Sequence, residues 1–170
     1  MKKVILSVVT FAAIMLFPGK ALAVGESTVA SVDVVPLISI EEITPLSFGK
    51  VYSGSTLGTV TVTTANARTN SGGVTLFGSD QTTARYNILG NASATYAITV
   101  PTSPINVTKD LVNLEVSNFQ AKSTSTNSGT SGSLATDGTD SFVVGATLTL
   151  PASTVPGRYT GTFEVSVAYN

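Results

Sequence analysis

The most regular pattern of hydrophobic and polar positions lies in residues 158–169. Every second residue from Tyr159 to Tyr169 is apolar or glycine, and the residues between them are mostly polar. Side chains of a β-strand alternate between two faces, so this pattern predicts a half-buried strand over Arg158–Tyr169. Because chain ends usually fray, so regular a terminus indicates an end that is held in a sheet and recognised there.

The rest of the chain after residue 24 shows similar short runs and no apolar repeat of helical period. Turn-forming clusters rich in Gly, Ser, Asn and Pro separate the runs. Further strands are predicted at residues 28–35, 37–43, 46–51, 58–64, 73–77, 84–89, 94–100, 105–109, 112–119 and 141–150. Many short strands at this spacing predict an all-β, immunoglobulin-like antiparallel β-sandwich. Strand exchange between copies could complete such a sandwich.

The segment 24–35 also alternates, and it lies directly before Pro36. One of its two rows could enter a hydrophobic groove: Thr28, Ala30, Val32 and Val34. Proline has no amide hydrogen to donate to a ladder, so Pro36 separates this segment from the strand that follows. We therefore predict an N-terminal extension at 24–35, a candidate donor strand, followed by a β-sandwich domain at 36–170.

One stretch, Ala121–Asp140, departs from the alternating pattern because it contains almost nothing to bury. A loop of this length is either functional or mobile. Two interpretations stay open at this point: a solvated hairpin tip or short polar strand, and a ligand-binding loop.

The first residues have the features of an export signal. Lys2 and Lys3 precede an apolar run at residues 4–17, and a small-residue site follows at Ala21–Ala23. The run is shorter than the roughly 20 residues that span a membrane, so it predicts a signal peptide at 1–23 that is cleaved rather than an anchor. We expect export through the inner membrane to the periplasm or the cell surface, without embedding in a membrane.

Charge and composition narrow the function classes. Nine basic residues, less the three in the signal, leave six against ten acidic ones, a net charge of −4 for residues 24–170. That balance argues against nucleic acid as a partner. The chain has no histidine and no cysteine, which excludes Ser-His-Asp and Cys-His nucleophiles, thiolate chemistry and ordinary zinc sites. We expect no enzyme and no cofactor.

The acidic residues offer little chemistry. Glu41 and Glu42 are adjacent, so on a strand they point to opposite faces and cannot act as a pair. Asp137 and Asp140 could contribute to a calcium site, but two carboxylates without the full loop spacing are weak evidence. A turn between strands explains them more simply, and we expect no metal.

Two resemblances carry the functional expectation. The C-terminal strand resembles that of subunits in chaperone–usher fimbriae, on the residues Gly157, Tyr159, Phe163, Val165, Val167 and the penultimate Tyr169. This resemblance implies that a periplasmic chaperone recognises this strand and that the sandwich lacks one strand. The extension of the next subunit would supply the missing strand at an outer-membrane usher. Residues Leu46–Gly49 and Phe142–Asn170 are similar to a family of exported bacterial β-domains of unknown function. Many fimbrial subunits have a disulfide near their start, and this chain has none.

The resulting hypothesis is a structural subunit of a bacterial surface filament, a fimbria or pilus, assembled from copies of itself or related subunits by donor-strand exchange. A contribution to cell adhesion would be a further role. The alternative is a self-contained secreted or periplasmic β-sandwich that binds a ligand such as glycan through Ala121–Asp140. In that alternative, Thr28–Val35 pairs within its own sheet.

Overall fold

A computed structural model describes residues 25–170, which contain ten strands and no helix. The predicted signal peptide at 1–23 lies outside the described residues. The strands are β1 (Ser39–Thr44), β2 (Lys50–Val62), β3 (Arg68–Phe77), β4 (Ala84–Leu89), β5 (Thr95–Thr99), β6 (Ile105–Lys109), β7 (Val112–Ser123), β8 (Ser131–Ser133), β9 (Thr139–Leu150) and β10 (Ser166–Tyr169). Residues Val34–Asn170 form one compact unit.

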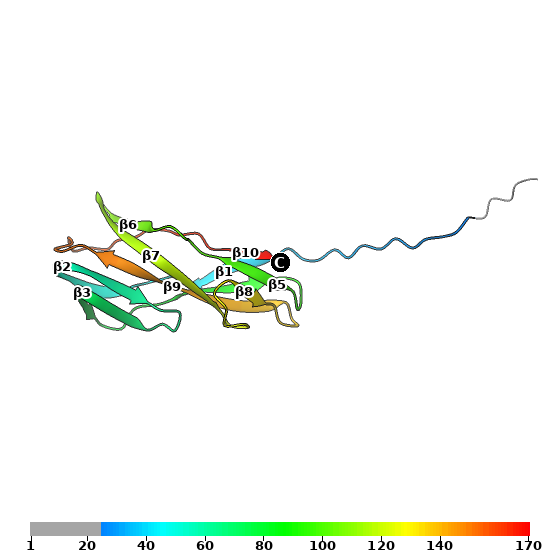
Figure 1. The fold of residues 1–170 in the computed structure, drawn as a ribbon, viewed down its shortest axis with the longest axis horizontal. Helices are drawn as coiled ribbons and strands as arrows, with labels where there is room; N and C mark the ends of the chain where they lie inside the picture. Colours follow the sequence, from blue (N-terminus) through cyan, green and yellow to red (C-terminus); the bar gives the residue numbers. More distant parts are fainter. Residues whose placement is uncertain (1–24) are drawn as a thin grey trace, which may run out of the picture. The chain divides into compact units, whose positions relative to one another are not determined.

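The strands form two antiparallel sheets, as Figure 1 shows. The large sheet has the order β1-β4-β9-β2-β3, and β7 and then β6 continue it from the other side of β9. The small sheet has the order β10-β5-β8. The central strand β9 pairs with β4 over its first half, with β2 over its second half, and with β7 on its opposite edge. The predicted all-β antiparallel sandwich is confirmed.

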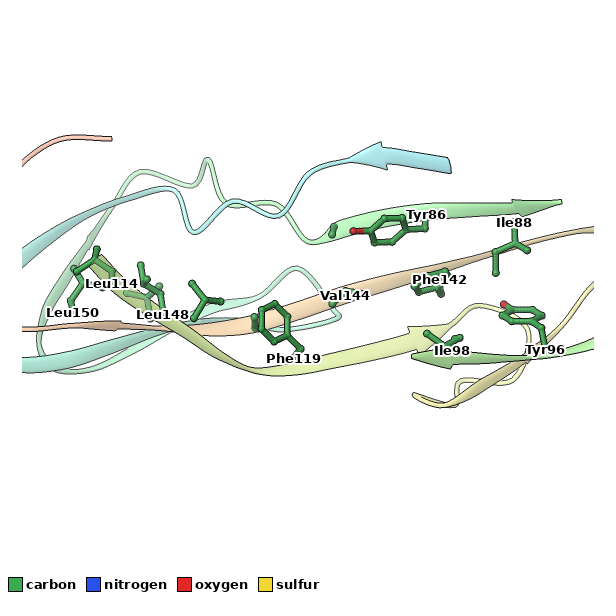
Figure 2. Close-up of a cluster of buried hydrophobic side chains, with 14 of the residues drawn as sticks. Tyr86, Ile88, Tyr96, Ile98, Leu114, Phe119, Phe142, Val144, Leu148 and Leu150 are labelled. Atoms are coloured by element: carbon green, nitrogen blue, oxygen red, sulfur yellow. The ribbon is translucent and has the colours of Figure 1, made fainter. Parts of the chain in front are cut away.

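Most of the buried core side chains belong to strands of the large sheet, and Tyr96 and Ile98 of β5 contribute from the small sheet. In β4, Ala84, Tyr86 and Ile88 are buried while the residues between them are exposed, which is the alternation expected of a strand with one wet face. Figure 2 shows Tyr86 stacked on Phe142 of β9, with ring centroids 5.0 Å apart. Side chains of this size dominate the energetics of a small core.

Several predicted strands are longer than expected. The segments 46–51 and 58–64 were predicted as two strands because residues 53–55 resemble a turn, but β2 runs without a break from the end of the first segment into the second. Its register with β3 shifts between Ser53 and Gly58. The extra residues form a bulge rather than a hairpin, and a bulge bends a strand without ending it.

The corner before β2 is organised around one arginine. Arg68 donates from Nη1 to the carbonyl oxygen of Phe48 at 2.9 Å and from Nη2 to that of Gly78 at 2.5 Å. Gly49 has a φ of 70°, and a Cβ atom there would fall on Nη1 of Arg68. The Leu-x-Phe-Gly stretch at 46–49 therefore ends in glycine for two physical reasons, its left-handed backbone and the close approach of the guanidinium.

Candidate functional site

The N-terminal extension is exposed throughout residues 25–37, and this range contains no strand. Every side chain of the predicted donor row is exposed: Thr28, Ala30, Val32 and Val34. Val32 is 84% and Val34 90% exposed, and Val29 in the opposite row is 91% exposed. Burial of a valine side chain contributes about 1.5–3 kcal/mol. The extension therefore carries hydrophobic side chains that the described residues leave exposed to solvent.

This arrangement overturns one expectation of the ligand-binding alternative. That alternative required Thr28–Val35 to pair within its own sheet, and the expected pairing is wrong, because β1 begins at Ser39 and no described strand precedes it. Pro36 lies between the two segments and cannot donate a ladder hydrogen bond.

The C-terminal segment, residues 158–170, keeps its predicted alternation but not its predicted ladder. Alternate side chains are half-buried against the core: Tyr159, Phe163, Val165, Val167 and Tyr169. Only Ser166–Tyr169 forms a strand, β10, and Thr160 adds one isolated bridge to Thr108 of β6. The prediction of a continuous strand over Arg158–Tyr169 is therefore wrong.

The ladder breaks because the opposing edge carries extra residues. The C-terminal segment takes six steps from Thr160 to Ser166. The opposing edge takes nine steps over the same distance, from Thr108 back to Thr99. The surplus includes the two prolines of residues 101–104, which lie between β5 and β6 and have no amide hydrogen to donate to a ladder with the C-terminal segment. The backbone just before β10 therefore lies in no strand.

Side-chain packing holds this segment where the ladder is missing. The ring of Phe163 lies 4.9 Å from that of Phe119 on β7, centroid to centroid. Gly161 approaches β6 so closely that a Cβ atom there would lie 2.5 Å from the carbonyl oxygen of Asn106. Among the described strands, β10 pairs only with β5. A packed apolar row beside an unpaired backbone edge is a surface that an additional strand can complete.

Gly157 and Tyr159 begin this segment and have local roles. Gly157 has a φ of 153°, a conformation that glycine adopts far more readily than other residues. The hydroxyl of Tyr159 donates to the carbonyl oxygen of Val155 at 2.8 Å. The geometry thus accounts for Gly157 as a turn residue, and its role in chaperone recognition stays a prediction.

Tyr169, at the other end of the segment, contacts two distant parts of the chain. Its hydroxyl donates to the carbonyl oxygen of Pro36 at 3.0 Å and accepts from the amide of Asn91 at 2.6 Å. Gly90 leaves room for this hydroxyl, since a Cβ atom at position 90 would overlap it. The penultimate residue therefore joins β10 to the β4–β5 loop and to the residue three positions before β1.

The polar tract Ala121–Asp140 forms ordered structure. It includes the end of β7, the short strand β8, which pairs with β5, and the start of β9. Serine and threonine hydroxyls hold its turns: Thr126 donates to the carbonyl oxygen of Ser131 at 2.7 Å. Of the two interpretations left open, the short polar strand describes this geometry.

A partly buried polar cluster that includes residues of this tract was missed by sequence reasoning. The hydroxyl of Tyr96, a fully buried residue of β5, donates to Oδ2 of Asp140 at 2.8 Å. Ser125 donates to the same oxygen at 2.5 Å, and the buried Ser123 at 3.3 Å. Burial raises the pKa of Tyr96, and its hydrogen bond to Asp140 raises it further. The cluster joins β5, β7 and β9, so its role is structural.

The remaining carboxylates form no candidate metal centre. Asp137 accepts hydrogen bonds from the hydroxyl and then the amide of Thr139, and these lower the pKa of its carboxyl group. Within residues 25–170, no group of three or more His, Cys, Asp or Glu side chains could hold a metal ion. The same part of the chain contains no helix long and apolar enough to cross a membrane.

Comparisons with known proteins place the domain in a family. No curated protein matches the chain, and no solved structure does. The family described as "Domain of unknown function (DUF4402)" matches residues 38–169, from the residue before β1 to the end of β10. Since this match spans most of the chain and almost the whole sandwich, the chain belongs to the DUF4402 family.

Proposed function

We propose that the protein is a subunit of a bacterial surface filament and that it assembles head to tail by donor-strand exchange. In this proposal the extension at 24–35 of one copy enters beside the C-terminal segment of the next copy. One observation carries the proposal: an alternating segment without a ladder partner precedes the domain, and an apolar row with an unpaired backbone edge ends it.

The donor side is supported by the pattern of the extension. Val32 and Val34 belong to one row and are almost fully exposed, and an isolated exposed segment gains no stability from such residues. Insertion into a sandwich would bury them, with about 1.5–3 kcal/mol for each valine. A new ladder would add about 0.5–1.5 kcal/mol for each hydrogen bond.

The acceptor side is supported by the C-terminal segment. Phe163, Val165 and Val167 pack against the core yet stay half-exposed, so a strand laid beside them would cover apolar surface. Unpaired edges of this kind invite association with other chains unless something covers them. Addition of a strand satisfies both the side chains and the backbone.

The geometry of the joint determines the assembly. Donor and acceptor are different surfaces of the same molecule, so the contact is heterologous, and heterologous contacts that do not close build open filaments. Export by the signal at 1–23 would bring the subunit to the periplasm, where a chaperone would cover the acceptor edge until an outer-membrane usher passes the subunit to the cell surface. Adhesion would be a property of the assembled filament.

The test is removal and replacement of the extension. A variant lacking residues 25–35 should stay folded, because these residues are exposed and contribute no strand. It should lose the ladder of oligomers that the intact protein forms on unboiled detergent gels, and a synthetic peptide of residues 25–35 should bind it and raise its melting temperature. A scrambled peptide of the same composition is the control. Unfolding of the deletion variant, or no oligomer ladder from the intact protein, would refute the proposal and favour a self-contained ligand-binding sandwich.

A further inference from the structure

One hydroxyl group joins the two ends of the domain. The side chain of Tyr169 in β10 donates to the carbonyl oxygen of Pro36, three residues before β1, and accepts from the amide of Asn91. Figure 1 shows β1 and β10 near each other at the C-terminus, although they belong to different sheets.

We propose that Tyr169, Pro36 and Asn91 form a terminus clasp, which holds the start of β1 to the final strand and carries tension between them in the assembled filament. The part about tension rests on the proposed function. A pulling force on the filament would enter each subunit through its extension, which continues directly into Pro36. The force would leave the subunit through its C-terminal segment, which would hold the extension of the neighbouring subunit. The clasp connects these two points.

The position of β1 explains why a clasp is needed. Among the strands that the structure describes, β1 is an edge strand that pairs only with β4, and its register shifts between Glu42 and Thr44. A force applied at Pro36 would peel this strand from the sheet, starting at Ser39. With the carbonyl oxygen of Pro36 bonded to Tyr169, the force passes first to β10 and from there to β5. The hydroxyl is thus a positioning group, and the bond to Asn91 fixes its orientation.

The first test uses the isolated monomer. Tyr169→Phe removes only the hydroxyl, and Tyr159→Phe is the matched control, since the hydroxyl of Tyr159 also donates to a backbone carbonyl. In hydrogen exchange followed by NMR, Tyr169→Phe should accelerate the amides of Asn91 and of β1 about three- to tenfold, the effect of one lost hydrogen bond. The control should leave both unchanged. Acceleration at Asn91 without any change in β1 would overturn the clasp.

The second test applies force along the proposed path. The chain has no cysteine, so Ala30→Cys and a cysteine added after Asn170 give two unique attachment points. Forced unfolding reports the unfolding rate, and Tyr169→Phe should raise that rate about three- to tenfold at constant force, whereas Tyr159→Phe should not. Equal rates for all three proteins would refute the transfer of tension. Since both tests use monomers, they stand even if the protein forms no filament, and filament failure alone would refute only the proposed function.

Discussion

Val32→Asp is the substitution that most directly tests the predicted donor row. Val32 is 84% exposed in the extension and Val29, in the opposite row, is 91% exposed. Since exposed substitutions usually change stability by no more than about 0.5 kcal/mol, neither Val32→Asp nor Val29→Asp should alter the folding of the domain. Only the first should weaken assembly, because only the row of Val32 is predicted to enter the neighbouring subunit.

The expected effect on the joint is large. Val32→Asp would remove about 1.5–3 kcal/mol of valine burial and would place a carboxylate in an apolar environment without a partner, which costs several kcal/mol more. A loss of only about 3 kcal/mol already weakens binding by roughly a hundredfold. Val29→Asp would keep its carboxylate in water, as Asp33 in the same row does, and should weaken binding by less than about threefold.

The assay measures capture of labelled peptides of residues 25–35 by the domain that lacks its own extension. Fluorescence anisotropy gives the dissociation constants of the unmodified, Val32→Asp and Val29→Asp peptides, and unboiled gels of the full-length variants give the oligomer ladder. If Val29→Asp alone abolished capture, the assignment of the inserted row would be refuted. If neither substitution had an effect, the reasoning from exposed valines to strand exchange would fail.

Three further predictions concern the stability of the domain. Tyr96→Phe, which removes a part-buried hydrogen bond to a carboxylate, should lower the free energy of unfolding in urea by about 1.5–3 kcal/mol. An equally large effect of Tyr159→Phe, which removes an exposed hydrogen bond, would contradict this. Gly49→Ala should lower the free energy of unfolding more than Gly78→Ala does, by at least about 1 kcal/mol. Both glycines have a positive φ, but only at position 49 would a Cβ atom meet a guanidinium. Equal melting temperatures of the two variants would show that backbone strain alone matters. Burial, followed by the charge of a nearby glutamate, raises the pKa of Tyr86 to about 12. The contribution of Tyr86 to stability is therefore complete below about pH 10 and is lost as the pH rises toward 12. The urea midpoint should fall over this range, less steeply in Tyr86→Phe, and the same fall in both proteins would refute the assignment of this pH dependence to Tyr86.

Local pattern predicted the strands well where one face is wet and the ends are marked. β4 and β6 have the predicted bounds, 84–89 and 105–109, because each alternates cleanly between turn-forming residues. Pattern failed where a strand bends: residues 53–55 look like a turn, yet they belong to the bulge of β2. Whether such residues turn the chain or bulge out of a ladder depends on the partner strand β3, which local sequence does not describe.

The sequence pattern predicted which side chains of the C-terminal segment face the core, but it did not predict how the backbone of that segment pairs. Alternation correctly placed Phe163, Val165 and Val167 on the inner face, because the core binds them whether or not a ladder exists. The missing ladder depends on the opposing edge at residues 101–104, and no property of the C-terminal segment itself reveals it. The bond between Tyr96 and Asp140 was missed for a similar reason, since it joins residues far apart in the sequence that only the packing of the small sheet against the large one brings together.

The placement of charges gives an independent reason to regard the two under-paired segments as partners. Edge strands commonly carry charges that block pairing with other chains. In Thr28–Val35 the only charge is Asp33, which belongs to the row opposite Val32. In the C-terminal segment both charges, Arg158 and Glu164, belong to the exposed row, opposite Phe163. Within Thr28–Val35 and the C-terminal segment, no charge therefore lies on the face that would be covered, and both faces lack the usual protection there. Glu26, nearer the start of the extension, does share the row of Val32.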